Sequence, residues 1–371
     1  MTSNLSRSPA ETGQHGPYST VAVIGAGAWG TALALIASKA GRAVRLWGRN
    51  AQDIATIGNT GQNLRYLPGI DLPRGVTATA DIETALSGAE CVLIVTPSVT
   101  LREICRQMAP HVAPRVPLVL CAKGIETGSG KLLSEVASEE LPGHPIGALS
   151  GPTFARETAL NYPTAVTLAF PFAQADRRDP RAAPASRLAL SLGSENFRPY
   201  VSDDLVGVEV AGAVKNVVAI ACGMMTGAGY AENTRAALIT WGIDEMKALA
   251  EARGGRRETI AGLSGIGDLT LTCSSTTSRN MHFGVQLGSG IARENVFDGT
   301  PVVVEGEVNA ISVVDLADRI GLDMPVCRAV NAILHEGADL RRTFAALWAR
   351  PITGENKFLN LALENPAGTP G

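Results

Sequence analysis

The sequence predicts an α/β domain with a mostly parallel sheet, followed by an all-α domain. From Ser19, short β-branched apolar runs alternate with helical stretches that finish near glycine or proline, which is the pattern of βαβ units. After about residue 204 these strand signals fade, and alanine-, glycine- and leucine-rich helical patterns continue to the end. A chain of 371 residues exceeds the usual size of one core, so two domains of different type are expected.

These patterns divide the chain. We expect residues 1–18 to be a disordered polar tail, 19–204 an α/β domain and 205–371 a helical domain. Residues of about 171–187 are rich in proline, alanine and charge, and are predicted to form an exposed insertion. The last residues, 364–371, resemble disordered sequence.

Eight runs are predicted to be strands. Several are apolar throughout, as expected for strands that helices cover on both faces. The runs are residues 20–25, 43–48, 75–79, 90–97, 117–124, 146–151, 163–170 and 197–202.

Composition restricts the function classes. A net charge of -3 provides no general attraction to nucleic acid or to an anionic membrane. No apolar run appears long enough to span a membrane, and the N-terminus lacks the apolar core of a signal peptide. The six cysteines form no CxxC, so buried free thiols in a reducing cytoplasm are expected. No ligand spacing suggests a metal.

The first strand leads into a glycine-rich turn, "VIGAGAWGTALA". Gly25 would permit the tight turn, Gly27 would let backbone amides approach a pyrophosphate, and Gly30 would let the helix pack closely on the strand. A GxGxxG between a strand and a helix predicts a Rossmann-like dinucleotide site, with the helix N-terminus facing the phosphates. Trp29 is either a core aromatic or a lid on the cofactor.

The residue after the second strand bears on the choice of cofactor. An acid at this distance from the glycines normally binds the adenine ribose of NAD, but here the residue is Arg49. A guanidinium suits a 2′-phosphate, which favours NADPH over NADH; a solvated arginine at a strand end is the alternative.

Polar residues also follow two later strands. Lys123 would lie at the carboxyl edge of the sheet, where α/β proteins bind ligands, although an exposed lysine is common there. In "SGPTFA", Gly151 and Thr153 could contact an anion, or Thr153 could cap the next helix.

Three further features lie in the helical half. Asp268 in "GIGDLTLTC" is either a catalytic group or a helix cap. The triplet "SRN", residues 278–280, suits a phosphate but is also common on surfaces. Lys215 stands alone in the apolar run "EVAGAVKNVVAIACGMM", where it either extends its amine to water or moves a proton in a cleft.

Together these strings resemble NAD(P)-dependent glycerol-3-phosphate dehydrogenase of the bacterial soluble type. The resemblance rests on GAGAWGTALA, LWGRN, AKGIE, SGPTFA, GAVKNVVAI, GLSGIGDLTLTC, SRN with the following FG, and VVEG, in colinear order over about residues 20–345. It implies a reversible reduction of dihydroxyacetone phosphate by NADPH or NADH to sn-glycerol 3-phosphate, a backbone for glycerophospholipid synthesis. It also implies that residues 19–204 are a dinucleotide-binding Rossmann-like domain and 205–371 a helical substrate and catalytic domain, with the active site between them.

The resemblance assigns roles to individual residues. Lys215, in AVKN, would be the general acid and base, and Lys123 would contact both substrate and cofactor. The other substrate-binding positions implied are Gly151, Thr153, Asp268, Ser278, Arg279 and Asn280. The cofactor positions implied are Gly25, Gly27, Trp29, Gly30, Arg49, Lys123, Ala155, Arg279, Val303 and Glu305. The small residues 211–213 would let the helix that carries Lys215 approach the nucleotide domain.

Two alternatives remain at this stage. One is another two-domain dehydrogenase, acting on a β-hydroxyacid or on ketopantoate, and the other is a regulatory protein that binds NADPH without turnover. Departures from the family pattern are Ala28, where a hydroxyl residue is frequent, the insertion after Phe170 and the N-terminal tail. A homodimer is one candidate for the oligomeric state of the protein.

Overall fold

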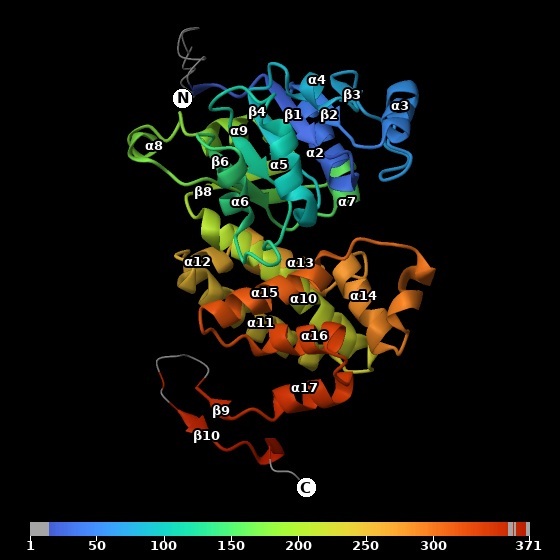
Figure 1. The fold of residues 1–371 in the computed structure, drawn as a ribbon, viewed down its shortest axis with the longest axis vertical. Helices are drawn as coiled ribbons and strands as arrows, with labels where there is room; N and C mark the ends of the chain where they lie inside the picture. The colour runs from blue at the N-terminus through green and yellow to red at the C-terminus, as the bar shows by residue number, and fades with distance from the viewer. Residues whose placement is uncertain (1–14, 355–358, 360, 369–371) are drawn as a thin grey trace, which may run out of the picture.

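The structure is a computed structural model that describes residues 15–354, 359 and 361–368. It consists of a sheet covered by helices and, below it in Figure 1, a bundle of helices. The last strand of the sheet ends at Ser202 and the first helix of the bundle begins at Leu205. The predicted fold class, a mostly parallel α/β part followed by a helical part, is confirmed. Most of the predicted tail, residues 1–14, lies outside the described residues.

Eight strands form one sheet, and each lies within one of the eight predicted runs. The strands are β1 (Thr20–Ile24), β2 (Ala43–Trp47), β3 (Val76–Thr79), β4 (Cys91–Ile94), β5 (Leu118–Leu120), β6 (Ile146–Ser150), β7 (Thr164–Ala169) and β8 (Phe197–Ser202). Their order is β3-β2-β1-β4-β5-β6-β7-β8, and only the β6–β7 pair is antiparallel.

The register aligns the carboxyl ends of the central strands. Ile24 pairs with Ile94, Ile94 with Leu120, and Leu120 with Ala148. The chain order reverses between β1 and β4, so ligands are expected at this edge. The segments that begin at Gly25, Cys121 and Gly151 therefore leave the sheet on the same side.

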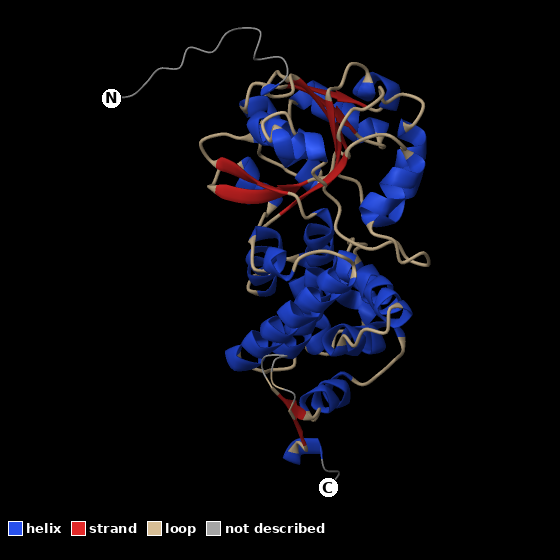
Figure 2. Ribbon diagram, turned by 90° about the vertical axis from the view of Figure 1, so that its left-hand side faces the viewer, coloured by secondary structure: helices blue, strands red, loops and turns tan. Residues whose placement is uncertain are grey.

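Helices cover both faces of the sheet (Figure 2). One apolar cluster joins α4, α5 and α6 to one face, and a second joins α2, α3 and α9 to the other. The helices of this part are α2 (Ala28–Lys39), α3 (Ala51–Thr60), α4 (Ile82–Leu86), α5 (Leu101–Met108), α6 (Leu133–Glu140), α7 (Ala155–Ala159), α8 (Gln174–Arg178) and α9 (Pro184–Leu192).

The helical part packs around α10 (Leu205–Gly227), which provides most of the centre of its core. The other helices are α11 (Glu232–Ala252), α12 (Arg257–Ile260), α13 (Asp268–Cys273), α14 (Arg279–Gly288), α15 (Glu305–Arg319), α16 (Pro325–His335) and α17 (Leu340–Trp348). Contrary to the sequence expectation, α10 is long and apolar enough to cross a membrane, but 94% of its most apolar window is buried inside the protein. It is a core helix.

Three features of the fold differ from the sequence expectations. Tyr18, assigned to the loose tail, is buried because its backbone donates to Ser191 and its ring stacks under the Arg187 guanidinium. The insertion ends earlier than predicted, because Ala183 is buried and α9 begins at Pro184. Short strands β9 (Ile352–Thr353) and β10 (Ala362–Leu363) pair after α17 within the otherwise helical half.

The extreme C-terminus also differs from the prediction of disorder for residues 364–371. The Asn365 amide donates to the carbonyl oxygens of Trp348 and Arg350, and Pro366–Gly368 form a 3₁₀ turn. These hydrogen bonds fasten this segment to the end of α17. Residues 369–371 lie outside the described part.

Backbone contact between α10 and α14 determines where the N-terminus of α14 lies. A Cβ built on Gly223 would lie 2.3 Å from the carbonyl oxygen of Met281, and one on Gly284 would lie 2.3 Å from that of Ile220. The obstacles are backbone atoms, which cannot move aside cheaply, so glycine is required on both helices.

We expect Gly284→Ala to lower the free energy of unfolding by about 1–3 kcal/mol, because the added methyl group must separate the two helices. Denaturant unfolding measures this loss. Gly58→Ala is the matched control: Gly58 lies within α3 with no atom near its would-be Cβ, so alanine should stabilise by about 0.5–1 kcal/mol. A Gly284→Ala protein as stable as the wild type would contradict the proposed close contact.

Candidate functional site

The glycine-rich turn has the geometry that a dinucleotide requires. Gly25 has φ of +125°, and a Cβ there would lie 2.8 Å from the carbonyl group of Val95. A Cβ on Gly30 would lie 1.8 Å from the carbonyl oxygen of Gly25, whereas one on Gly27 would meet no atom within 4 Å. Gly27 is the N-cap of α2. The open space at the N-terminus of this helix is therefore a place for a phosphate.

Three residues expected along the cofactor, Trp29, Ala155 and Arg49, differ in exposure. Trp29 on α2 and Ala155 on α7 are both half-buried and pack against one small apolar cluster, which is the behaviour of core residues. Arg49, directly after β2 and Gly48, is exposed, and its guanidinium has no partner among the described residues. The lid role of Trp29 stays a prediction.

Two lysines from different parts of the chain meet on one carboxylate. Lys123, three residues after β5, donates to Asp268 Oδ2 at 2.5 Å, and Lys215 on α10 donates to Asp268 Oδ1 at 2.8 Å. Asp268 begins α13, yet its carboxylate faces the lysines and caps no helix. The side chain of Asp268 is 2% exposed and that of Lys215 is 8% exposed, so neither charge is well hydrated.

Burial and neighbouring charge shift both pKa values. Burial lowers the pKa of Lys215; the Asp268 carboxylate opposes this shift and the Lys123 ammonium adds to it. Burial would raise the pKa of Asp268, but the two ammonium groups outweigh it and keep that pKa below its usual range. One carboxylate compensates only one of two cations, so Lys215 gives up its proton more readily than an exposed lysine does.

Thr272 completes this cluster. Its hydroxyl accepts a hydrogen bond from Lys215 Nζ at 2.8 Å and donates to the backbone oxygen of Asp268 at 2.6 Å. The residue lies four positions after Asp268 and therefore on the same face of α13. Thr272 is not among the predicted site residues, although its spacing from Asp268 in "GDLTLTC" is the signal that indicates it.

The turn before Asp268 is π-helical, Leu263–Gly267. The amide of Gly267 donates to the carbonyl oxygen of Gly262, five residues earlier, at 3.2 Å. A Cβ on Gly265 would lie 2.0 Å from the carbonyl oxygen of Ile260, so the wide turn needs a residue without a side chain there. Such turns are frequent at functional sites.

The "SGPT" segment lies against this turn. Gly151 has φ of +152° and is buried, and a Cβ on Gly267 would be 3.6 Å from the ring of Pro152. The hydroxyl of Thr153 donates to the carbonyl oxygen of Gly151 at 3.3 Å. The N-cap of α7 is Phe154, so the alternative of Thr153 as a helix cap does not apply.

The "SRN" residues occupy the start of α14 in three different ways. Ser278 is the N-cap, and its hydroxyl accepts from the amide of Met281. Asn280 is buried, donates to Asn216 Oδ1 and accepts from the amide of Gly306, both at 2.9 Å. Arg279 is exposed, and its guanidinium has no partner in the described part of the chain. Of the three side chains, that of Arg279 is therefore the one most accessible to a ligand.

The last two predicted cofactor residues lie at the start of α15. Glu305, its first residue, accepts from the Asn216 amide at 3.2 Å, which links it to the helix of Lys215. Val303 is 52% exposed and lines a surface hollow with Phe297 and Thr300. Among the described residues no group of three or more His, Cys, Asp or Glu is placed to bind a metal.

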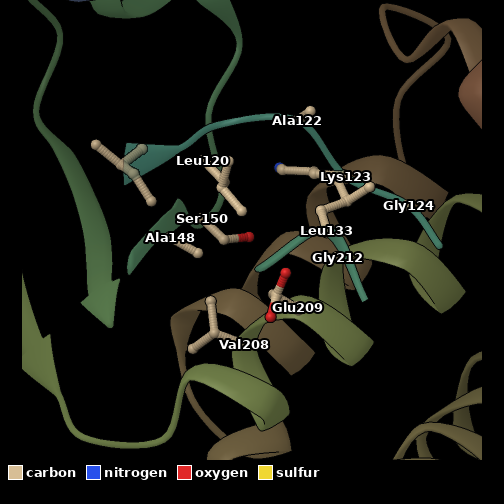
Figure 3. A pocket seen from close by; sticks show the side chains of 11 residues that line it. Leu120, Ala122, Lys123, Gly124, Leu133, Ala148, Ser150, Val208, Glu209 and Gly212 are labelled. Carbon is tan, nitrogen blue, oxygen red and sulfur yellow. The ribbon is translucent and has the colours of Figure 1, made fainter. Parts of the chain in front are cut away.

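A small cavity lies beside Lys123 (Figure 3). Lys123, Gly212, Ser150 and Glu209 line it, and a Cβ on Gly212 would be 3.3 Å from Lys123 Cγ. Glu209 Oε1 and Oε2 accept hydrogen bonds from the amide and hydroxyl of Ser134, at 2.8 and 2.5 Å. This contact joins α10 to the start of α6. Burial raises the pKa of Glu209 to about 7 despite these donors.

Comparisons with known proteins agree with one another. Models described as the N-terminus and the C-terminus of NAD-dependent glycerol-3-phosphate dehydrogenase match residues 20–176 and 204–345. The chain is 48% identical over 335 residues to glycerol-3-phosphate dehydrogenase [NAD(P)+] of Rhodospirillum rubrum, covering 90% of this chain and 93% of that protein. It is 46% identical over 338 residues to the protein of that name from Caulobacter vibrioides, covering 91% and 99%.

A solved structure is similar over the same extent. Glycerol-3-phosphate dehydrogenase from Coxiella burnetii superposes with a TM-score of 0.83 at 38% identity, over 90% of this chain and 99% of that one. The similarity therefore spans both the sheet and the helical bundle.

The raised pKa of Glu209 predicts how stability depends on pH. A carboxyl group whose pKa rises from 4.5 unfolded to about 7 folded stabilises fully below the lower value, and this contribution is lost as the pH rises through about 7. Glu209→Gln should therefore flatten the decline of unfolding free energy between pH 5 and 8, by up to about 3 kcal/mol.

Denaturant unfolding at several pH values measures this slope. Glu245 is similarly buried, accepts from the amides of Val326 and Cys327, and also has its pKa raised to about 7, so Glu245→Gln should flatten the decline separately. The exposed Glu195→Gln controls for loss of charge. If Glu209→Gln kept the wild-type slope, the buried titration would be excluded as its cause.

Proposed function

Because this chain belongs to the family of NAD-dependent glycerol-3-phosphate dehydrogenases, we propose that it reversibly reduces dihydroxyacetone phosphate to sn-glycerol 3-phosphate with NADPH or NADH. The observation that carries this proposal is the pair of lysines on one buried carboxylate, between the carboxyl edge of the sheet and α10. Reduction of a ketone produces an alkoxide, which needs both a positive charge and a proton. The product is a glycerophospholipid backbone.

The sheet part, residues 19–204, would bind the dinucleotide. Its fit rests on Gly25, Gly27 and Gly30, which leave open space at the N-terminus of α2. Arg49 is exposed and has no acidic partner in the part of the chain that the structure describes, so it suits the 2′-phosphate of NADPH. When bound, the nicotinamide supplies the hydride.

Lys215 would be the general acid and base. Burial lowers the pKa of Lys215, so its ammonium transfers a proton to the substrate oxygen more easily, and its amine can take the proton back in the reverse reaction. The helical part, residues 205–371, would thus carry the catalytic group. Thr272 orients the amine through the hydrogen bond that it accepts.

Lys123 and Asp268 would arrange the charge around that proton. Asp268 holds both amines close together, and Lys123 provides a second cation near the developing alkoxide. Gly151 and Thr153, which lie against the turn before Asp268, would complete the substrate site.

The substrate phosphate would bind at the N-terminus of α14. The Arg279 guanidinium there has no partner among the described residues, and the first amides of a ten-residue helix favour an anion. Ser278 and Asn280 support this end of the helix through the cap and the contacts to Asn216 and Gly306. Binding energy from the phosphate can then hold the carbonyl group in a reactive position.

The two alternatives have less support. A dehydrogenase for phosphate-free acids would not need Arg279 at the start of α14, and a sensor without turnover would not need two lysines on Asp268. The six cysteines are all buried free thiols, which supports the cytoplasm as the location. Assembly as a homodimer stays a prediction.

We expect Lys215→Met to lower kcat for dihydroxyacetone phosphate by at least about 100-fold, because it removes the proton donor, while NADPH still binds. Absorbance of NADPH and NADH, measured in parallel, reports turnover and cofactor preference, and fluorescence reports binding. The exposed Lys39→Met is the control for loss of a lysine. Near wild-type turnover of the Lys215→Met protein would refute the assignment.

Arg279→Ala should lower kcat/KM for dihydroxyacetone phosphate by about 100-fold and change that for dihydroxyacetone little, because only the first substrate carries a phosphate. Steady-state kinetics with both substrates test this difference. The exposed Arg74→Ala is the matched control, since it too has no partner in the described chain. An equal loss on the two substrates would exclude the phosphate role.

A further inference from the structure

We propose that Asn309 is a positioning residue that fixes the spacing of the backbones that carry Lys123 and Lys215; the proposal rests on the catalytic roles proposed for these two lysines. Asn309 lies on α15 and is 1% exposed. It touches neither lysine side chain in the contacts that the structure describes, so it acts through the two backbones.

The side-chain amide of Asn309 bridges the two backbone segments that carry Lys123 and Lys215. Asn309 Nδ2 donates to the carbonyl oxygen of Lys123 at 3.3 Å and to that of Ala213 at 3.2 Å. Ala213 precedes Lys215 by two residues on α10. The amide therefore ties the segment after β5 to the helix that carries the proposed proton donor.

Asp268 and Asn309 restrain the same two segments at different points. Asp268 binds the tips of the two lysine side chains, at Nζ of Lys123 and Nζ of Lys215. Asn309 binds the backbone of Lys123 itself and, on α10, the backbone of Ala213, two residues before Lys215. With side chains and backbones both linked, the two segments have little freedom to separate when substrate enters.

The surroundings allow little adjustment of the Asn309 side chain. A Cβ on Gly124 would lie 2.8 Å from Asn309 Oδ1 and 3.0 Å from Ser98 Oγ, so the backbone next to Lys123 approaches the amide closely. Asn309 Oδ1 is buried and has no partner among the described residues. Since an unpaired buried oxygen is costly, the bonds of Nδ2 to both carbonyl oxygens must outweigh that cost.

Helix α15 also bonds, at a second point, to the loop that follows β5 and contains Lys123. Arg319, at the end of α15, donates to the carbonyl oxygens of Ser129 and Gly128. On the other side, Arg102 on α5 forms a bidentate ion pair with Glu126. The segment is thus restrained from both parts of the molecule, and Asn309 is the restraint nearest the lysine.

Asparagine suits this position because one nitrogen presents two N–H groups to two acceptors. Leucine has a similar size but no donor, so Asn309→Leu breaks both hydrogen bonds with little change of volume. Serine has one donor and can retain at most one of them.

We expect Asn309→Leu to lower kcat for dihydroxyacetone phosphate by about 10- to 100-fold while the dissociation constant for NADPH stays unchanged, because the reacting groups are displaced and the nucleotide site is not. Asn309→Ser should lower kcat by a smaller factor, because serine can retain one of the two hydrogen bonds. Ser312→Ala is the matched control: Ser312 is a buried polar residue one turn along α15, and among the described residues its hydroxyl bonds to the carbonyl oxygen of Asn309 in the same helix. Circular dichroism and denaturant unfolding report folding; if Asn309→Leu does not fold, Asn309→Ser carries the same test.

A double-mutant cycle with Lys123→Met then decides the role. If Asn309 acts by placing Lys123, Asn309→Leu should cost little further activity in the Lys123→Met background. Equal fold-losses in the wild-type and Lys123→Met backgrounds, or a fall in NADPH affinity that accounts for the loss, would overturn the proposal. These outcomes leave the lysines essential, whereas failure of the proposed function would appear as Lys123→Met and Lys215→Met proteins that keep wild-type turnover.

Discussion

The sharing of the Asp268 carboxylate between Lys123 and Lys215 is the interaction on which the candidate site depends. It brings together a segment from the sheet edge, the central helix of the bundle and a short helix that contributes the acid. The buried Lys215 and the half-buried Lys123 around one buried anion would be unstable if any of the three were displaced, since breaking a buried pair costs several kcal/mol. The packing of α13 and α15 against α10 holds this arrangement, in which burial and the second ammonium group lower the pKa of Lys215.

Much of the fold could be predicted because its signals are local. The eight strands follow from short apolar runs between turn residues, and the turn at Gly25, Gly27 and Gly30 follows from steric needs that only glycine meets. Ordered loops after parallel strands lie at one edge, so the proximity of Gly25, Lys123 and Gly151 could also be anticipated. The meeting of Lys215 with Asp268 was expected from the family resemblance, not from spacing.

Contacts between distant segments could not be predicted in this way. The chain separates Asn309 from Lys123 by 186 residues, and no pattern around either residue indicates the bond. Tyr18 was assigned to the tail from the polar residues around it, and its partners Arg187 and Ser191 lie about 170 residues along the chain. Asn280 looked like a ligand residue, yet its amide binds Asn216 and Gly306, because a side chain's partners depend on tertiary packing that a tripeptide does not encode.

The π-helical turn before Asp268 makes chain length, in addition to the glycine at position 265, a sensitive property of this segment. Each residue advances a helix by about 100°, so deletion of one residue between Gly262 and Asp268 would rotate the carboxylate away from both amines. Ile266 in the same turn is 37% exposed, so its side chain is free to vary. A substitution at Ile266 leaves the length of the turn unchanged, whereas the loss of a single codon from the gene would disconnect the Asp268 carboxylate from both ammonium groups.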